Sequence, residues 1–342
     1  MKRQQQSIED GARLLREGGL VLFPTETVYG LGADAGNNRA CLRIFEAKER
    51  PPDNPLIVHI ADIEQLAGMC EGAPPDSALR AFELFSPGPI TVVVAHNGSI
   101  CPAATTGLPT VAVRIPSHPV ARSLLAAAAI PVAAPSANRS GRPSPTSYAM
   151  AVEAMEGRAD LILDGGTCEV GLESTILDCT GTPNRILRPG GVTREMLLDA
   201  GFHLALPEEG DQGGEDHYRA PGSRYQHYRP KATVRLAESR EREGVERFLA
   251  AEGVASVLVL GLREQIEPLS SLLSLAPAVA EVQRFESLEE FGRSIYDSFF
   301  RADRRGLRSV LVLLPEGVGV GVAIRDRLAR AVGAVLEPTD QA

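Results

Sequence analysis

The alternation of apolar and polar positions divides the chain into short strands and amphipathic helices. Residues 110–115 alternate strictly, which predicts a strand with apolar side chains on one face and with Thr110 and Arg114 together on the other. Apolar residues at helical spacing predict a helix over 7–17, which a pair of glycines ends. Strands and helices continue to alternate at close spacing, and this pattern predicts an α/β domain.

The stretch at 19–31, GLVLFPTETVYGL, combines an apolar run with a polar end. The run stops at Pro24, and three polar residues follow it. Such a pattern predicts a buried strand that delivers hydroxyl groups and a carboxylate to the edge of a sheet. An ordinary strand followed by a turn has the same pattern, so the stretch alone leaves both interpretations open.

Cationic side chains accompany two of the predicted elements. Arg114 projects from the middle of its strand, where it either pairs with a nearby carboxylate or serves a binding site. A helix that starts near Asn38 must end at the proline pair 51–52, which places Lys48 and Arg50 on its last turn. A local basic site is therefore available to an anion.

The segment 135–146, PSANRSGRPSPT, is a stiff polar loop before a helix predicted at 147–156. It holds hydroxyl groups, an amide, two arginines and three prolines. Loops of this composition bind anions through backbone N–H and hydroxyl groups at a helix N-terminus. A solvated surface loop is the competing interpretation.

The chain length of 342 residues suits two domains, and the composition changes between them. We expect a first α/β domain over 1–202 and an acidic, glycine-rich linker over 203–230, whose second half carries His227 and Tyr228. The remainder, 231–342, alternates strand and helix, which predicts a small parallel sheet. Its role and the oligomeric state do not follow from the sequence.

The composition excludes several classes of protein. The net charge of −9 argues against a nucleic-acid coat, because phosphate backbones are bound through clustered lysine and arginine, so we expect no strong direct binding of nucleic acid. No apolar stretch approaches the roughly 18 residues of a membrane span, and no signal-peptide pattern begins the chain, so we expect a cytoplasmic protein without membrane contact. The five widely spaced cysteines lack a C-x-x-C pair, which argues against disulfides and structural zinc.

Polar side chains gather at the predicted strand ends and in the loops beyond them. Several cations and many neutral donors around one cavity suit a polyanion such as a nucleoside triphosphate. The phosphate-loop motif G-x-x-x-x-G-K-[ST] is absent from the sequence, and so is a His/Cys metal-ligand pattern. The chemistry therefore points to phosphate binding by an unfamiliar arrangement of residues.

Six ordered segments resemble the YrdC-like threonylcarbamoyl-adenylate synthases. They are FPTETVYGL at 23–31, KERP at 48–51, NPL at 54–56, SPGPIT at 86–91, PSAN at 135–138 and ESTI at 173–176. The resemblance spans 7–200, and the segment from PG at 221–222 to HY at 227–228 is similar to the longer branch of the family. It implies a YrdC-like twisted mixed sheet with helices, plus a smaller C-terminal Rossmann-like parallel α/β domain.

The resemblance also implies an activity. Members of the family combine L-threonine, bicarbonate and ATP to give threonylcarbamoyl-AMP and pyrophosphate, the first step of N6-threonylcarbamoyladenosine formation in tRNA. A downstream tRNA threonylcarbamoyl-transferase would be the partner that takes the product onward. ATP would be a substrate and Mg²⁺ the cofactor, held mainly by the ATP phosphates and not by side chains.

Site residues carried over from the family fall into three overlapping sets. The catalytic set would be Lys48, Arg50, Ser136 and Asn138. The ATP contacts would be Arg50, Asn54, Thr110, Ser136, Ser144, Arg188 and Tyr228, with Tyr228 reaching from the linker to cover the nucleotide. The threonine contacts would be Thr27, His59, Arg114, Ala134 through its backbone, and Ser174, with Arg114 on the amino-acid carboxylate.

Two alternative functions stay open at this point. A double-stranded RNA-binding module would need a basic surface wider than a cleft, which the net charge of −9 disfavours. A related carbamoyl-transfer maturation enzyme would carry zinc-finger cysteines and further domains, and this sequence has neither.

Overall fold

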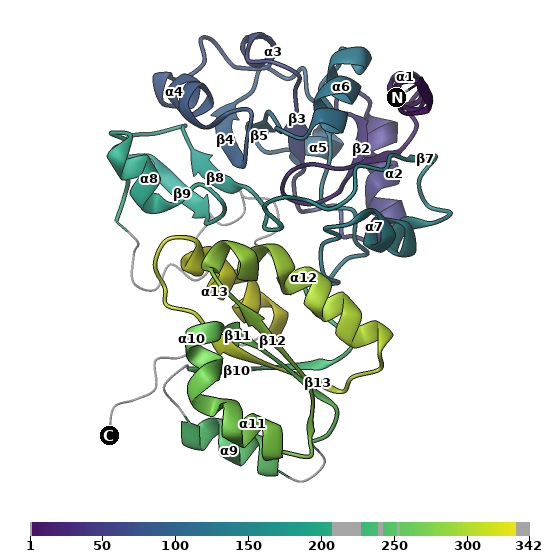
Figure 1. The fold of residues 1–342 in the computed structure, drawn as a ribbon. Helices are drawn as coiled ribbons and strands as arrows, with labels where there is room; N and C mark the ends of the chain where they lie inside the picture. The colour runs from purple at the N-terminus through teal and green to yellow at the C-terminus, as the bar shows by residue number, and fades with distance from the viewer. Residues whose placement is uncertain (1, 207–226, 239–241, 252–253, 333–342) are drawn as a thin grey trace. The chain divides into compact units, whose positions relative to one another are not determined.

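The computed structural model describes residues 2–206, 227–238, 242–251 and 254–332, and the chain folds as two compact units (Figure 1). One unit comprises Met1–Ser140 and Ser144–Tyr225, and the other comprises Gly141–Pro143 and Gln226–Ala342. The predicted combination of a mixed α/β domain with a smaller parallel one is confirmed. The predicted boundaries at 202 and 230 remain predictions.

The first unit is built on a mixed sheet in which the described strands run in the order β7-β1-β2-β6-β3-β5-β4-β8-β9. The strands are β1 (Val21–Phe23), β2 (Gly30–Asp34), β3 (Ile57–His59), β4 (Ile90–Ala95), β5 (Thr110–Arg114), β6 (Val132–Ala133), β7 (Leu161–Ile162), β8 (Thr175–Asp178) and β9 (Arg185–Arg188). The β3–β5 pair is parallel and lies between antiparallel pairs, with His59 beside Arg114. The centre of the sheet therefore brings a histidine and an arginine together.

The helices of this unit cover the sheet unevenly. They are α1 (Lys2–Arg16), α2 (Asn38–Lys48), α3 (Glu64–Ala67), α4 (Asp76–Phe85), α5 (Pro102–Thr105), α6 (Pro119–Ala128), α7 (Tyr148–Met155) and α8 (Arg194–Asp199). The main core joins α2 and α4 to the sheet face that carries Val92 and Val113, and α1 packs on α6 over a second cluster. The opposite face of the central strands carries a small apolar cluster of Ile57, Val93, Ala112 and Ile176.

The sequence misjudged the end of α2 by two residues. Glu49 adopts the left-handed conformation (φ 53°) and caps the helix, with its N–H directed at the carbonyls of Phe45 and Glu46. Lys48 is thus the last helical residue, while Arg50 lies beyond the helix and not on its last turn. The two cations leave the backbone on either side of this reversal.

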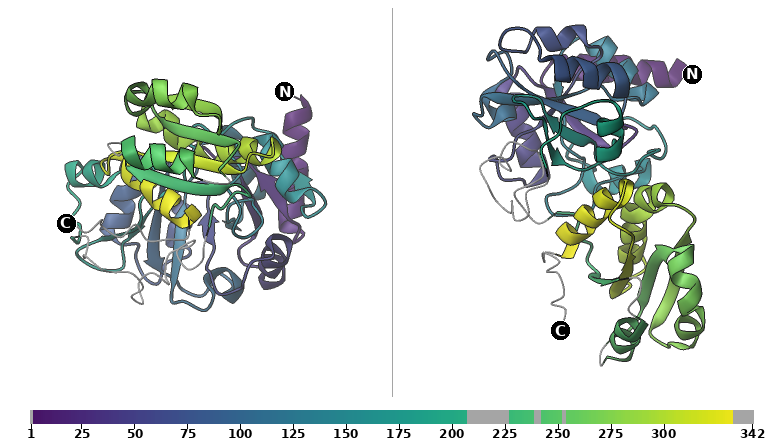
Figure 2. Two further views of the ribbon diagram at one scale, coloured as in Figure 1. Left: turned by 90° about the horizontal axis from the view of Figure 1, so that it is seen from below. Right: turned by 90° about the vertical axis from the view of Figure 1, so that its left-hand side faces the viewer.

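The second unit is a parallel sheet with helices on both faces (Figures 1 and 2). Its strands β10 (Thr233–Glu238), β11 (Val257–Leu262), β12 (Val279–Phe285) and β13 (Ser309–Leu314) are arranged in the order β10-β13-β11-β12. The helices are α9 (Arg242–Ala250), α10 (Arg263–Ile266), the 3-10 helix η2 (Glu267–Leu269), α11 (Ser270–Leu275), α12 (Leu288–Arg304) and α13 (Val320–Val332). Helices α12 and α13 lie on one face, and α9, α10 and α11 on the other.

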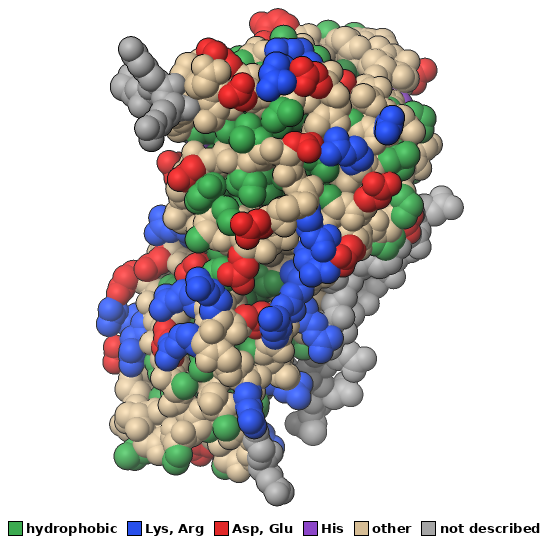
Figure 3. All heavy atoms as spheres, turned by 90° about the vertical axis from the view of Figure 1, so that its right-hand side faces the viewer, with side chains coloured by type: hydrophobic (Ala, Val, Ile, Leu, Met, Phe, Trp, Pro, Cys, Tyr) green, Lys and Arg blue, Asp and Glu red, His purple; other side chains and the backbone are tan. Residues whose placement is uncertain are grey.

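Charged side chains on the second unit are of both signs. Figure 3 shows basic and acidic groups interspersed on the visible face, and Arg301 and Arg305 of the α12 region both pair with Glu281 of β12. A broad, purely basic surface of the kind that double-stranded RNA requires does not appear on that face. Within the described ranges, every helix is too short or too polar to cross a bilayer.

All five cysteines are free thiols in buried positions. They pack as small apolar residues of the core, and the disulfides that the sequence argued against are not formed.

Candidate functional site

Two of the predicted threonine-binding residues, Thr27 and His59, lie beside Arg114 at the end of β5. Its side chain is only 4% exposed, and Nη2 lies 2.6 Å from Glu26 Oε1. Nη1 donates to Thr27 Oγ1 at 2.8 Å, and Nε donates to the Gly88 carbonyl at 3.4 Å. The salt bridge that the sequence left open exists, and the same guanidinium also reaches a predicted substrate contact.

Glu26 is the carboxylate that the opening stretch was expected to deliver to the sheet edge, and its pairing with Arg114 was not predicted. Its second oxygen, Oε2, accepts the backbone N–H of Ser117 at 2.9 Å, so both carboxylate oxygens are engaged. Burial disfavours its ionisation, but the charge and hydrogen bond of Arg114 outweigh burial and hold the pKa below its ordinary value. The pair therefore stabilises the fold fully above the ordinary carboxylate pKa, and this contribution is lost as the pH falls through the lowered value.

His59 lies beside this ion pair as a neutral imidazole. Burial, and then the charge of Arg114, lower the pKa of His59 to about 3. Its ring meets the edge of Phe23 with centroids 5.9 Å apart, which fixes the ring orientation. His59 can thus exchange hydrogen bonds with a ligand without adding charge to the pocket.

The backbone around Thr27 and Ala134 is ordered by the sheet. Thr25 Oγ1 lies 2.8 Å from Thr27 Oγ1 and also donates to the Val28 carbonyl at 2.6 Å. The Ala134 N–H donates to the Ile57 carbonyl at 2.8 Å, so a backbone contact from Ala134 to a ligand has to use its carbonyl. The polar end of the opening stretch is therefore a hydrogen-bonded turn, and its Thr27 hydroxyl contacts Arg114.

Lys48 holds the predicted phosphate loop by its backbone. Its buried ammonium donates to the carbonyls of Ser136 and Asn138, both at 2.5 Å, and lies 3.4 Å from Asn138 Oδ1. Asn138 Oδ1 in turn accepts the Ser136 hydroxyl at 2.6 Å. Burial, and then the charge of Arg50, hold the pKa of Lys48 well below its ordinary value. Three of the four predicted catalytic residues thus form one hydrogen-bonded group.

Arg50, Asn54 and Thr110 lie toward the other end of the β3–β5 pair. Arg50 Nη2 donates to the carbonyls of Asn54 at 3.2 Å and Pro55 at 3.4 Å. Asn54 and Pro55 precede β3, and Thr110 begins β5, which runs parallel to β3, so all three lie at the end away from His59 and Arg114. Thr110 and Arg114 are four residues apart on one face, roughly 13 Å along a strand. The predicted site therefore extends along the sheet from an amino-acid end to a nucleotide end.

Ser174 and Arg188, predicted to contact different substrates, contact each other. Arg188 donates from Nε and Nη2 to the Ser174 carbonyl at 3.1 and 2.9 Å, and the Ser174 hydroxyl lies 2.7 Å from Thr91 Oγ1. Gly190 allows this packing, since a Cβ there would lie 2.3 Å from the Thr175 nitrogen. Thr91, in the SPGPIT segment, is another residue that the sequence reasoning did not single out.

Ser144 donates its hydroxyl to Glu173 Oε1 at 2.7 Å, and both side chains are buried. Glu173 was not predicted, although it begins the ESTI segment. Among the described residues, no group of three or more His, Cys, Asp or Glu side chains is arranged to hold a metal ion.

Tyr228 belongs to the second unit, unlike the other predicted site residues. Its ring stacks on Tyr296 of α12 with centroids 5.2 Å apart and an interplanar angle of 30°. Its predicted contact with the nucleotide remains a prediction.

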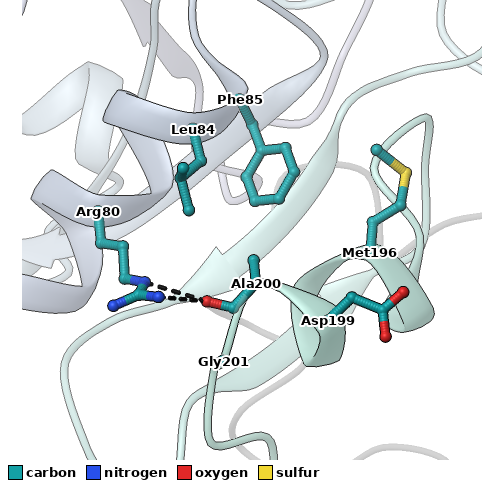
Figure 4. Close-up of a pocket in the computed structure, with 7 residues that line it drawn as sticks. All are labelled: Arg80, Leu84, Phe85, Met196, Asp199, Ala200 and Gly201. Carbon is teal, nitrogen blue, oxygen red and sulfur yellow. Dashed lines mark hydrogen bonds between the residues drawn. The ribbon is translucent and has the colours of Figure 1, made fainter.

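A surface hollow of about 570 Å³ lies elsewhere on the first unit, between α4 and α8 (Figure 4). Arg80, which lines it, donates to the Ala200 carbonyl from Nε at 3.1 Å and from Nη2 at 2.6 Å. Its lining residues, Arg80, Leu84, Phe85, Met196, Asp199, Ala200 and Gly201, include none of the predicted site residues. We therefore place the candidate site on the central strands and not in this hollow.

Known families and structures match nearly the whole chain. One family model, described as "Telomere recombination" (Sua5_yciO_yrdC), matches residues 13–190, and another, "Threonylcarbamoyl-AMP synthase, C-terminal domain", matches 192–333. The Pyrococcus abyssi protein named threonylcarbamoyl-AMP synthase is 39% identical over 334 residues, 96% of this chain and 95% of that protein. The Bacillus subtilis protein of the same name is 39% identical over 332 residues, or 95% and 93%. The crystal structure of P. abyssi Sua5 complexed with L-threonine matches with a TM-score of 0.86 and 37% identity, covering 96% and 95% of the two chains.

Proposed function

We infer the activity from the premise that this chain belongs to the threonylcarbamoyl-AMP synthase family in its two-domain form. It is an enzyme that converts L-threonine, bicarbonate and ATP into threonylcarbamoyl-AMP and pyrophosphate, and thereby serves tRNA modification. The observation that carries the assignment is the buried Arg114 beside neutral His59, because a fixed guanidinium on a sheet face suits an amino-acid carboxylate.

The amino-acid end would bind threonine through N–H groups that the fold leaves to Arg114. A guanidinium has five N–H donors, and the bonds to Glu26, Thr27 and Gly88 use one donor on each nitrogen. One N–H on Nη1 and one on Nη2 remain for a carboxylate in bidentate geometry. Thr27, His59, Ser174 and the Ala134 carbonyl would complete the contacts with the substrate.

The nucleotide end would bind ATP through the loop that Lys48 orders. Residues with cationic, hydroxyl or amide groups there are Lys48, Arg50, Asn54, Thr110, Ser136, Asn138, Ser144 and Arg188. This assignment is supported by the direct contacts among Lys48, Ser136 and Asn138 and by the contact between Arg188 and Ser174. Such groups stabilise the charge that develops on phosphate oxygens during phosphoryl chemistry.

The chemistry has two steps. The threonine amine adds to bicarbonate with loss of water, which gives a carbamate. A carbamate oxygen then attacks the α-phosphorus of ATP, the bond to the β-phosphate oxygen breaks, and pyrophosphate leaves. Arg50 would act on the phosphate oxygens and Lys48 would hold the loop that meets them, while Arg114 would hold the amino acid in place for the attack.

Mg²⁺ in this scheme would be carried by the ATP phosphates. The two buried carboxylates nearest the predicted residues are engaged by protein groups, Glu26 by Arg114 and Ser117 and Glu173 by Ser144. When bound, the ion would neutralise phosphate charge. The proposal also includes a downstream tRNA threonylcarbamoyl-transferase as the partner and a cytoplasmic location.

Pyrophosphate release from ATP tests the proposed reaction directly. We expect release only when L-threonine and bicarbonate are both present, since the carbamate is the nucleophile. Coupled phosphate detection in bicarbonate-depleted buffer measures the dependence. Release that ignores threonine contradicts the proposal, and turnover supported by carbamoyl phosphate in place of bicarbonate favours a carbamoyl-transfer enzyme.

Arg50→Ala should lower kcat/KM for ATP by about tenfold to a hundredfold, the loss that follows from removing hydrogen bonds to a charged group. The fold should persist, because the Arg50 side chain is only half-buried and its hydrogen bonds to the carbonyls of Asn54 and Pro55 are long, at 3.2 and 3.4 Å. Steady-state kinetics and a thermal melt measure the two effects. Arg122→Ala, an exposed change on α6, is the matched control. An unchanged kcat/KM removes Arg50 from the phosphate site.

A further inference from the structure

Tyr228 is held in an uncommon backbone conformation within the second unit. Its φ of 66° lies in the left-handed region, which bulky residues adopt rarely and keep only where their surroundings impose it. The ring stacks on Tyr296, and its centroid lies 5.6 Å from that of the preceding His227. The segment is therefore fixed at the position where the family resemblance places a nucleotide contact.

The helix α13 contributes a buried cation to the same place. The Arg327 side chain is fully buried, and its Cζ lies 5.9 Å from the centre of the Tyr228 ring. Arg327 pairs with the neighbouring carboxylate of Asp326, whose pKa is lowered because Arg327 and Arg330 together outweigh the effect of burial. Guanidinium and aromatic ring thus form a cation–π contact away from water, where such contacts are strongest.

The backbone that follows Tyr228 is anchored by α12. Both carboxylate oxygens of Asp303 accept the N–H of Lys231, at 2.8 and 2.9 Å, and Oδ1 also accepts the N–H of Ala232 at 3.0 Å. Three residues beyond the tyrosine, the chain is therefore tied to the same helix that supplies Tyr296. Side chain and backbone are fixed by separate contacts.

Packing alone does not explain Arg327. A buried ion pair commonly stabilises a fold no better than apolar residues of similar volume, and it costs desolvation of both charges. A methionine or leucine would fill the interior of α13 without that cost. The contact of the Arg327 guanidinium with the Tyr228 ring is an interaction that an apolar residue could not make.

We propose that the second unit serves the reaction by orienting Tyr228, and that Arg327 and Tyr296 are the positioning residues. The effect on catalysis rests on the proposed function, in which Tyr228 contacts the nucleotide. The holding of Tyr228 itself is a property of the ligand-free protein. The two statements can therefore be tested apart.

The first test measures amide hydrogen exchange of 227–232 in the full-length, ligand-free protein. Arg327→Met removes the cation and keeps much of the volume, and Tyr296→Leu removes the stacked ring without touching a charge. We expect exchange to rise about tenfold in each, as for the loss of one desolvated cation–π or aromatic contact. Arg325→Met, on the same helix, is the control, because Arg325 bonds to Glu238 and the Pro315 carbonyl instead. Unchanged exchange in both folded variants overturns the proposal.

The second test is a double-mutant cycle on kinetics with Tyr228→Ala. Arg327→Met should raise KM for ATP roughly threefold to tenfold in the native background and leave KM for threonine unchanged, the difference one positioning contact makes. In the Tyr228→Ala background the same change should add nothing, since no ring remains to orient. Arg327→Lys should recover part of the loss. Equal effects in both backgrounds overturn the positioning role, while absence of threonine-dependent pyrophosphate release in the wild type counts against the proposed function and leaves the exchange result standing.

Discussion

Lys48→Met should lower kcat for pyrophosphate release by about 10² to 10³-fold, as the removal of one preplaced charge donor does in other active sites. Methionine keeps much of the side-chain volume but donates no hydrogen bond. The carbonyls of Ser136 and Asn138 then lose their shared donor, which should cost about 1–3 kcal/mol of unfolding free energy. Single-turnover kinetics and urea unfolding measure the two losses.

The control for Lys48→Met is Arg122→Met, which removes an exposed cation from the same unit. It should change neither kcat nor stability by a measurable amount. Hydrogen exchange at 136–140 should rise in Lys48→Met alone, because that segment depends on the ammonium. A kcat within a factor of two of the wild type contradicts the role given to Lys48.

Arg114→Met should have the largest effect on stability. It leaves the buried Glu26 carboxylate without its partner, and breaking a buried ion pair on one side costs about 3–5 kcal/mol. KM for threonine should rise about tenfold to a hundredfold through the loss of charged hydrogen bonds to the substrate carboxylate. Urea unfolding and kinetics at varied threonine concentration measure these changes.

The double variant Glu26→Gln/Arg114→Met separates the two roles of Arg114. Removing the orphaned charge should restore more than half of the lost stability, since the unpaired carboxylate is the main cost. KM for threonine should stay raised, because the guanidinium is still absent. Recovery of the wild-type KM together with stability shows that Arg114 acts on the fold alone and contradicts its placement in the substrate site.

Strict alternation made the β5 prediction succeed. A period of two assigns Thr110 and Arg114 to one face whatever the neighbouring strands are, and the structure has them there. The strand β2 was missed because Gly30–Asp34 reads GLGAD, with two glycines and no alternation. It forms because β1 and β6 pair with it on either side, which is tertiary context that local propensity does not contain.

Most of the contacts in the site that the sequence did not predict join residues that are far apart in the chain. Glu26 and Arg114 are 88 positions apart, and neither segment contains a sequence signal for their pairing. The interaction of Lys48 with backbone carbonyls leaves no trace in the sequence at all, because any residue type supplies a carbonyl. The family motifs singled out Arg114 and Lys48 as candidates, while their hydrogen-bond partners are visible only in the fold.

The hydrogen bonds of Lys48 to the loop also determine the stage at which its ammonium group is dehydrated. The ammonium is buried against fixed carbonyl oxygens before any ligand arrives. Its dehydration therefore belongs to folding and not to substrate capture. The cation that orders this loop is thus preorganised before a ligand arrives, so it needs little reorganisation at the moment of reaction.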